Sequence, residues 1–194
     1  MIDKICFTTN NAHKLQEVKE IIGDSIQLLS LSDIGFSGEI PETHETLEEN
    51  SLEKARYIFD QFNIPVFSDD SGLEVGALGG KPGVHTAHYS RSRDAIANMT
   101  KVLNELKPSD SRKAQFRAVM TYIDAQGNAR QFEGIVEGEV AQQMSGADGF
   151  GYDPIFIPLG YHKTFAELSS EIKNGISHRK RALEKLVQFI KTSL

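Results

Sequence analysis

The chain has 194 residues, a formal net charge of −6 at pH 7, 39% hydrophobic residues and 25% charged residues. This composition disfavours a disordered or membrane protein, and the acidic balance argues against a protein whose whole surface binds nucleic acid. The first residues lack a signal-peptide pattern, and the single cysteine cannot form an internal disulfide, so we expect a cytoplasmic protein without a membrane partner.

The chain begins with a strand pattern followed by a helix pattern. The stretch "KICFTT", residues 4–9, predicts a strand, and apolar residues at helical spacing then predict a helix that ends at Gly23. The loop between them therefore leads into a helix N-terminus, where backbone N–H groups and the helix dipole favour an anion. Lys14 adds a full charge there, although Asn11 is also explained as a plain N-cap.

A second helix and a second strand lead to an acidic pair. Thr46 and Glu49 match a capping box that opens the helix, and "IPVF", residues 64–67, predicts a short buried strand. Asp69 and Asp70 are then expected at the carboxyl end of that strand. Either they are solvated in a turn, or they lie in a cleft where adjacent carboxylates repel and need a cation such as Mg²⁺.

Other acidic and histidine residues are weaker metal candidates. Most glutamates near the second helix are explained as acids that complement the helix dipole, and only Glu42, upstream of the cap, lacks such an explanation. His85 and His88 share a short loop with no third ligand at a recognisable spacing, so a zinc site is not expected.

The second half of the chain predicts a helix, a hairpin and a final helix. The first of these begins near Ser92 with Ile96 on its apolar face. Alternating residues 114–123, the turn "AQGN" and residues 130–140 predict an antiparallel hairpin, and Ser177 is expected to cap the final helix. Strands alternating with helices, followed by a hairpin, indicate an α/β protein with a mixed sheet of undetermined strand order.

Two stretches of the second half could contact a ligand. "GADGFGYDP" places Phe150 and Tyr152 among glycines, either as an aromatic wall for a base or as a tight turn. His178 and Arg179 fall in the first turn of the final helix, just after Lys173, and cations there suggest an anionic or electron-rich neighbour unless they form a solvated basic face. Together with the anion loop and the acidic pair, these stretches form the inventory for hydrolysis of a nucleoside phosphate.

Six stretches, in order over nearly the whole chain, resemble one known family: "TTNNAHK", "TLEENSLEKA", "SDDSGLEV", "GGKPGV", "GFGYDPIF" and "KNGISHR". The family is the noncanonical purine nucleoside triphosphate pyrophosphatases, the house-cleaning inosine and xanthosine triphosphatases. The resemblance implies an elongated α/β fold with two lobes around a long central mixed sheet. It also implies one pyrophosphatase domain over residues 1–194, with its active site in the cleft between the lobes.

The resemblance further implies a homodimer that uses Mg²⁺ to split ITP, dITP or XTP into the monophosphate and pyrophosphate. Asp70 is expected to be the catalytic base and, with Glu42, a ligand of Mg²⁺, with Asp69 and Glu49 close by. The remaining site residues are expected to bind the substrate. They are Thr9, Asn10, Asn11, Ala12, His13, Lys14 and Lys54 on the phosphate side, Ser71, and Phe150, Gly151, Tyr152, Asp153, Lys173, His178 and Arg179 around the base.

One position departs from the family pattern. Many bacterial relatives end the loop after "PGV" with arginine and tyrosine, whereas this chain has "HTAHYS", with His88 at the basic position. Since histidine titrates near neutral pH, a charge contact there depends on pH.

Three alternative functions are disfavoured by particular residues. A Maf-like pyrophosphatase acting on pyrimidine or modified nucleotides disagrees with the "SHR" and "GFGYDP" motifs. A regulatory nucleotide-binding module without catalysis would lack Asp70 or the lysines, which are present. A nucleic-acid-binding protein using "SHRKR" disagrees with the acidic net charge, so no nucleic acid partner is expected.

Overall fold

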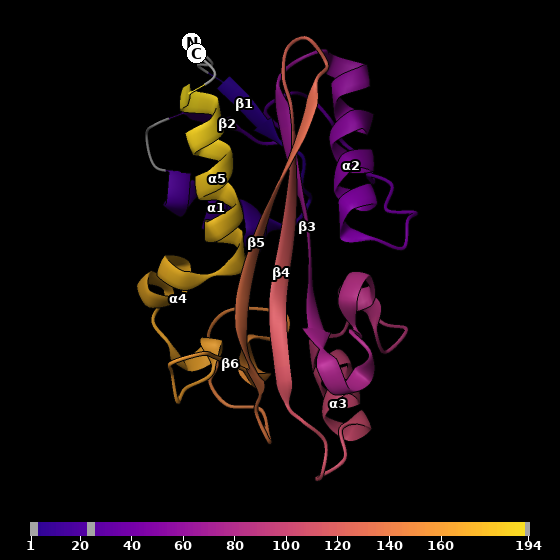
Figure 1. The fold of residues 1–194 in the computed structure, drawn as a ribbon. Coiled ribbons are helices and arrows are strands. Elements are labelled where there is room, and N and C mark those ends of the chain that lie inside the picture. The colour runs from indigo at the N-terminus through magenta and orange to yellow at the C-terminus, as the bar shows by residue number, and fades with distance from the viewer. Residues whose placement is uncertain (1–3, 23–25, 193–194) are drawn as a thin grey trace. The chain divides into compact units, whose positions relative to one another are not determined.

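The computed structural model describes residues 4–22 and 26–192, so the helix end expected at Gly23 lies outside the described residues. The helices and strands, drawn in Figure 1, follow in chain order. They are β1 (Lys4–Phe7), α1 (Ala12–Ile22), β2 (Gln27–Leu29), α2 (Leu47–Phe62), β3 (Val66–Val75), α3 (Ala95–Glu105), β4 (Lys113–Ile123), β5 (Ala129–Val140), β6 (Phe156–Pro158), α4 (Ser170–Ile176) and α5 (His178–Thr192).

The strands form one six-stranded sheet in the order β2-β1-β3-β4-β5-β6. β1 runs parallel to both β2 and β3, whereas β5 and β6 are antiparallel, so the sheet is mixed. The predicted α/β class and mixed sheet are therefore confirmed. The hairpin of β4 and β5 also forms as predicted, closed by a turn in which the Asp124 N–H donates to the Asn128 carbonyl oxygen at 3.1 Å.

The chain separates into two compact units. Unit 1 comprises Met1–Asp70, Ala118–Gly134 and Arg179–Leu194, and unit 2 comprises Ser71–Arg117 and Ile135–His178. The strands β3, β4 and β5 each begin in one unit and end in the other. The expected active site between two lobes remains a prediction. No helix among residues 4–22 and 26–192 is long and apolar enough to cross a membrane.

The sheet of unit 1 is covered on both faces. Apolar residues of α1 and α5 pack with Phe7 and Phe67 on one face, and those of α2 pack with Cys6 and Val66 on the other (Figure 1). Because both faces are covered, residues 119–123 of β4 are all buried, and the predicted alternation holds only in the first part of that strand.

The core of unit 2 joins α3 to the other ends of the long strands, and α3 differs from its prediction. Its N-cap is Asp94, whose carboxylate accepts the Ala97 N–H at 2.9 Å, so the helix begins after Asp94 rather than near Ser92. Ile96 was predicted on the apolar face but is 66% exposed, because it falls in the first turn, before the buried residues Met99 and Val102.

The strand β3 is longer than its prediction. It runs from Val66 to Val75, so the acidic pair lies inside the strand, and the prediction that the strand ends before it is wrong. Gly72 lies within the strand, and a Cβ built there would come within 2.2 Å of the Gly83 carbonyl oxygen. The glycine therefore permits a close approach of two backbone segments.

Gly72→Ala is expected to destabilise the protein by about 1–3 kcal/mol, because the added methyl group forces the backbone at Gly83 to move. Urea unfolding measures this change. Gly76→Ala is the matched control, since a Cβ there would have the Lys113 carbonyl oxygen as its nearest atom, at an ordinary 3.6 Å. Equal midpoints for the two variants would contradict the close approach.

Candidate active site

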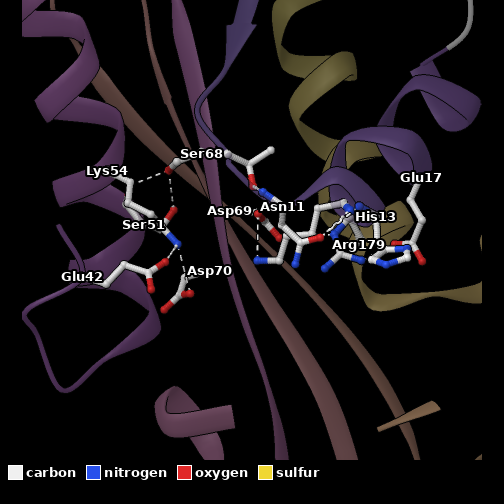
Figure 2. A network of polar contacts seen from close by, with 12 residues as sticks. Asn11, His13, Glu17, Glu42, Ser51, Lys54, Ser68, Asp69, Asp70 and Arg179 are labelled. Carbon is white, nitrogen blue, oxygen red and sulfur yellow. Dashed lines mark hydrogen bonds and ion pairs between the residues drawn. The ribbon is translucent and has the colours of Figure 1, made fainter. Parts of the chain in front are cut away.

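Asp69 and Asp70 lie on opposite faces of β3, because successive side chains of a strand alternate. Asp69 forms ion pairs with Lys14 of α1 and with Arg179 of α5, while Asp70 pairs with Lys54 of α2 (Figure 2). The expected position at a strand end and the interpretation of solvated carboxylates are therefore wrong, whereas the expectation of a cation beside the pair is confirmed. Each aspartate has its own ion pairs, and the charges of the two sets also act on one another, since Lys14 affects Asp70 and Lys54 affects Asp69.

The network on the α2 face centres on Lys54. Its ammonium group donates to Glu42 Oε1 at 2.6 Å and to Asp70 Oδ1 at 3.1 Å, and the side chains of Lys54 and Asp70 are almost fully buried. Burial alone would lower the pKa of Lys54, but Asp70 and Glu42 raise it, so the ammonium stays charged. Burial raises the pKa of Asp70 above its usual value, although Lys54 acts in the opposite direction.

The second oxygen of Asp70 is suited to a cation or a water molecule. Asp70 Oδ2 is buried and has no hydrogen-bond partner among the described residues. In the same part of the chain, no group of three or more His, Cys, Asp or Glu side chains could hold a metal ion. Mg²⁺ does not need such a group, since it keeps several waters and shares substrate phosphates with one or two carboxylates. Asp70 and Glu42 therefore fit Mg²⁺.

The network on the opposite face joins α1, β3 and α5 through charged side chains. Lys14 Nζ donates to Asp69 Oδ1 at 3.1 Å, Arg179 Nε donates to Asp69 Oδ2 at 3.2 Å, and Arg179 Nη1 donates to Glu17. Asp69 and Arg179 are 1% and 2% exposed, so both charges depend on these partners. Burial alone would raise the pKa of Asp69, but Lys14 and Arg179 hold it well below its usual range.

This network confirms the expectation of an anionic neighbour for the cations at the start of the final helix. The anions are Asp69 and Glu17 of the protein itself. The sequence reasoning missed Glu17, which lies one turn after Lys14 in α1 and is buried. That spacing places both side chains on one helix face and was the available signal.

The loop before α1 is held by its own side chains. Asn11 Oδ1 accepts the N–H groups of His13 at 3.0 Å and Lys14 at 3.2 Å, which confirms Asn11 as an N-cap. Thr9 Oγ1 accepts the Asn11 N–H at 3.1 Å, and Asn10 Nδ2 donates to the Gly38 carbonyl oxygen at 2.8 Å. The loop is thus ordered by internal bonds, while residues 10–13, which include Ala12, remain exposed.

A separate charged cluster forms within unit 2. Asp153 Oδ2 accepts from Lys173 Nζ and from the Phe150 N–H, both at 2.7 Å, and the Lys173 ammonium lies 4.7 Å from the Phe150 ring centroid. Gly149 and Gly151 have positive φ values of 79° and 61° in the turn that carries Phe150. The turn therefore presents a half-buried aromatic ring beside a fixed ammonium group.

Two other residues expected at the base lie in the core of unit 2. Tyr152 is 3% exposed and donates its hydroxyl to the Thr86 carbonyl oxygen at 2.9 Å. The ring of His178, which is 6% exposed, stacks on Phe116 with centroids 4.8 Å apart. For Tyr152 the structure favours the tight-turn interpretation over the aromatic wall.

The remaining candidates belong to both units. Ser71 is half-buried and is the first residue of unit 2 in β3. The Glu49 N–H donates to Thr46 Oγ1 at 3.2 Å, which confirms Thr46 as the N-cap of α2, and the Glu49 carboxylate accepts from the same hydroxyl at 2.8 Å. His85 and His88 are exposed, with ring centroids 5.6 Å apart. The substrate role of Ser71, like those of the other site residues, remains a prediction.

Together the fold and the two charge networks define a mixed α/β protein whose buried lysine and carboxylates suit a phosphorylated ligand. The chain belongs to the Ham1 family, whose model matches residues 5–189. This match confirms the resemblance that the sequence motifs carry.

Curated relatives match over nearly the whole chain. One from Flavobacterium johnsoniae, named dITP/XTP pyrophosphatase, is 43% identical over 96% of this chain and 97% of its own length. Another of the same name, from Bacillus subtilis, is 44% identical over 94% of each chain. The solved structure of the Staphylococcus aureus Ham1 protein has a TM-score of 0.89 and 36% identity, covering 98% of this chain and 100% of its own.

Proposed function

We propose that the protein hydrolyses the noncanonical purine nucleotides ITP, dITP and XTP to the monophosphate and pyrophosphate in a reaction that uses Mg²⁺, and so removes them from the nucleotide pool. The protein is a nucleoside triphosphate pyrophosphatase, the enzyme class given by the names of relatives that match nearly its entire length. The observation that carries the proposal is buried Asp70, with one oxygen bound to Lys54 and the other without a hydrogen-bond partner among residues 4–22 and 26–192.

Asp70 is the proposed catalytic carboxylate. Its second oxygen can accept a hydrogen bond from the attacking water and orient or deprotonate it. Because burial raises the pKa of Asp70, the carboxylate is a better base near neutral pH than an exposed aspartate. Mg²⁺, held by Asp70 and Glu42, supplies charge neutralisation at the phosphates when bound.

Lys54 and Lys14 are the proposed phosphate contacts. Both are held by carboxylates, Lys54 by Asp70 and Glu42 and Lys14 by Asp69, so their ammonium groups are fixed before substrate arrives. Fixed positive charges stabilise the charge that develops on a pyrophosphate leaving group at little reorganisation cost. These lysines therefore support cleavage between the α- and β-phosphates.

Base selection is proposed to rest on donors at the start of α5. Hypoxanthine, the base of inosine, and xanthine carry a carbonyl at position 6, where adenine carries an amine. Arg179 and the His178 backbone N–H can donate to that carbonyl oxygen but not to the amine. A mismatch that leaves buried donors unpaired can discriminate by about 10⁴-fold to 10⁵-fold. Guanine shares the carbonyl, so its rejection needs a further contact.

The substrate class is tested by the initial rates on ITP, XTP, ATP and GTP, with Mg²⁺ and with excess chelator. The proposal expects ITP and XTP to exceed ATP and GTP by at least about 10²-fold, and chelator to abolish all turnover. Equal rates on all four nucleotides would return the Maf-like or a general hydrolase to consideration.

Arg179→Lys is expected to reduce the preference for ITP over ATP by at least about tenfold, because lysine keeps the charge facing Asp69 but loses the planar fork of donors. The ratio of the two kcat/KM values measures this preference. Lys180→Ala, which changes the next cation of the same helix, is the control and should leave the ratio unchanged. An unchanged ratio in Arg179→Lys would assign base selection to other residues.

We also propose that the protein is a homodimer and lies in the cytoplasm. The first follows from the sequence resemblance and the second from the composition and the pattern of the first residues. Gel filtration with light scattering tests the first of these directly.

A further inference from the structure

Two serines tie α2 to β3 inside unit 1. Ser51 of α2 and Ser68 of β3 are both 0% exposed. Their hydroxyl oxygens lie 2.9 Å apart, and Ser68 Oγ also donates to the Ser51 carbonyl oxygen at 2.5 Å (Figure 2). One strand side chain is therefore bonded to both the side chain and the backbone of one helix residue.

The protons of this pair can be assigned. A serine hydroxyl has one proton and two acceptor lone pairs. Because Ser68 gives its proton to the carbonyl oxygen of Ser51, the contact between the hydroxyls must use the proton of Ser51. Both hydroxyl protons then have an acceptor, so neither buried serine leaves a hydrogen-bond donor unsatisfied. Two alanines would fill similar space, but hydrogen bonds also fix a distance and a direction.

The pair lies beside the Lys54–Asp70 ion pair on the same two elements. Ser51 precedes Lys54 by one helical turn, so the two side chains share a face of α2. Ser68 and Asp70 are alternate residues of β3 and share a face of the strand. The ion pair, with 3.1 Å between Lys54 Nζ and Asp70 Oδ1, thus spans the helix and strand that the serines join.

Lys54 depends on such a tie because its buried side chain has little room to adjust. Its ammonium group must stay within reach of two carboxylates, at 2.6 Å from Glu42 and 3.1 Å from Asp70, at the end of a long flexible side chain. A small slide or rotation of α2 on β3 would move the base of that chain. The serine bonds resist both movements, because they join the two elements one turn from Lys54.

We propose that Ser51 and Ser68 are positioning residues, which hold α2 in register on β3 so that Lys54 meets Asp70. The effect on catalysis rests on the proposed function, in which Asp70 is the catalytic carboxylate. Ser68 contributes more to this positioning than Ser51. Removal of the Ser68 hydroxyl breaks both hydrogen bonds, whereas removal of the Ser51 hydroxyl leaves the hydrogen bond to the carbonyl oxygen.

The first test measures kcat and KM for ITP in Ser68→Ala, Ser51→Ala and the double variant. A misplacement of about 1 Å can cost about 10²-fold in rate, so we expect kcat to fall about tenfold in Ser68→Ala, with KM within about twofold. Ser51→Ala should fall less, and the double variant should match Ser68→Ala. Thr121→Val is the matched control: Thr121 is also 0% exposed and accepts one hydrogen bond, from Gln131 at 3.0 Å, and its kcat should not change.

The second test does not depend on catalysis. Lys54 is 5% exposed, so acetylation by an amine reagent, followed by mass spectrometry, reports how often its ammonium group opens to solvent. Relative to exposed Lys107, the labelling of Lys54 should accelerate about tenfold in Ser68→Ala and stay at the wild-type rate in Thr121→Val. The inference would be overturned if Ser68→Ala and Thr121→Val had equal labelling rates of Lys54 and equal kcat. Both variants are measured at the same number of degrees below their own melting temperatures.

The two tests separate the inference from the proposed function. If the wild-type protein does not hydrolyse ITP, the proposed function fails, while the labelling of Lys54 still decides whether the serines position it. If Ser68→Ala does not fold, both measurements are made on Ser51→Ala. We then expect a smaller increase in the labelling rate of Lys54 and a smaller decrease in kcat. Wild-type values of both would overturn the inference.

Discussion

Asp70→Asn is expected to lower kcat by about 10³-fold and to leave the free energy of unfolding within about 1 kcal/mol of wild type. The amide keeps the size of the side chain but cannot take a proton from water. Stability is spared because burial raises the pKa of Asp70, so its charge favours the folded state less than an ordinary aspartate would at neutral pH. Lys54 also keeps its partner Glu42.

Single-turnover kinetics and the affinity for ITP together measure this effect. The affinity should change little, since the lysines that contact the phosphates are retained. Asp60→Asn changes an exposed acid of α2 and is the control, with kcat expected at the wild-type value. A near-normal rate in Asp70→Asn would show that another group activates the water.

Asp69→Asn is expected to have the opposite signature, with the free energy of unfolding reduced by about 3 kcal/mol. Loss of the Asp69 charge removes the ion pair of Lys14 and one ion pair of Arg179, which keeps its ion pair with Glu17. Removal of one partner from a buried ion pair costs about 3–5 kcal/mol, and the retained Glu17 places this change at the lower end. Urea unfolding at pH 7 measures it.

The same substitution predicts a dependence on pH. The pKa of Asp69 lies well below its usual value of about 3.9, because Lys14 and Arg179 oppose the effect of burial. A depressed pKa contributes stability that is complete above the unfolded pKa and is lost as the pH falls towards the folded pKa. The difference in the free energy of unfolding between wild type and Asp69→Asn should therefore decrease below about pH 4. A gap that widens with acid would contradict the assignment.

Except for α4, the helices and most strands could be predicted from the sequence because their apolar residues recur at the right period. β3 could not, since "SDDSGLEV" has polar residues on both faces and a glycine that resembles a turn. Its continuation depends on pairing with β4, which lies far along the chain. α4 was missed because it is short and contains the Asn174–Gly175 pair, an ordinary turn signal.

The candidate site shows the same division. The motifs identified Asp70, Lys54 and Lys14, but no local pattern could show that Asp69 and Asp70 face different helices, because that requires knowing that the strand continues. From the sequence of α1 alone, Glu17 would be expected to face solvent. It is buried because Arg179 of α5, far along the chain, forms an ion pair with it.

The polar residues buried on α2 carry a similar lesson. The apolar residues Ala55 and Ile58 of α2 lie in the core, and the polar residues Ser51 and Lys54 of the same helix are also buried. Polar side chains inside an otherwise apolar face break the local rule, and such breaks are expected where a site is built. The face of α2 next to Asp70 is one such place.

The most direct test of the account is to incubate the purified protein with ITP and Mg²⁺ and to separate the products by ion-exchange chromatography. The account predicts IMP and pyrophosphate in equal amounts, with no IDP at any time, and no products from Asp70→Asn. IDP and phosphate would contradict it, because the fixed lysines and Asp70 would then serve cleavage at the terminal phosphate.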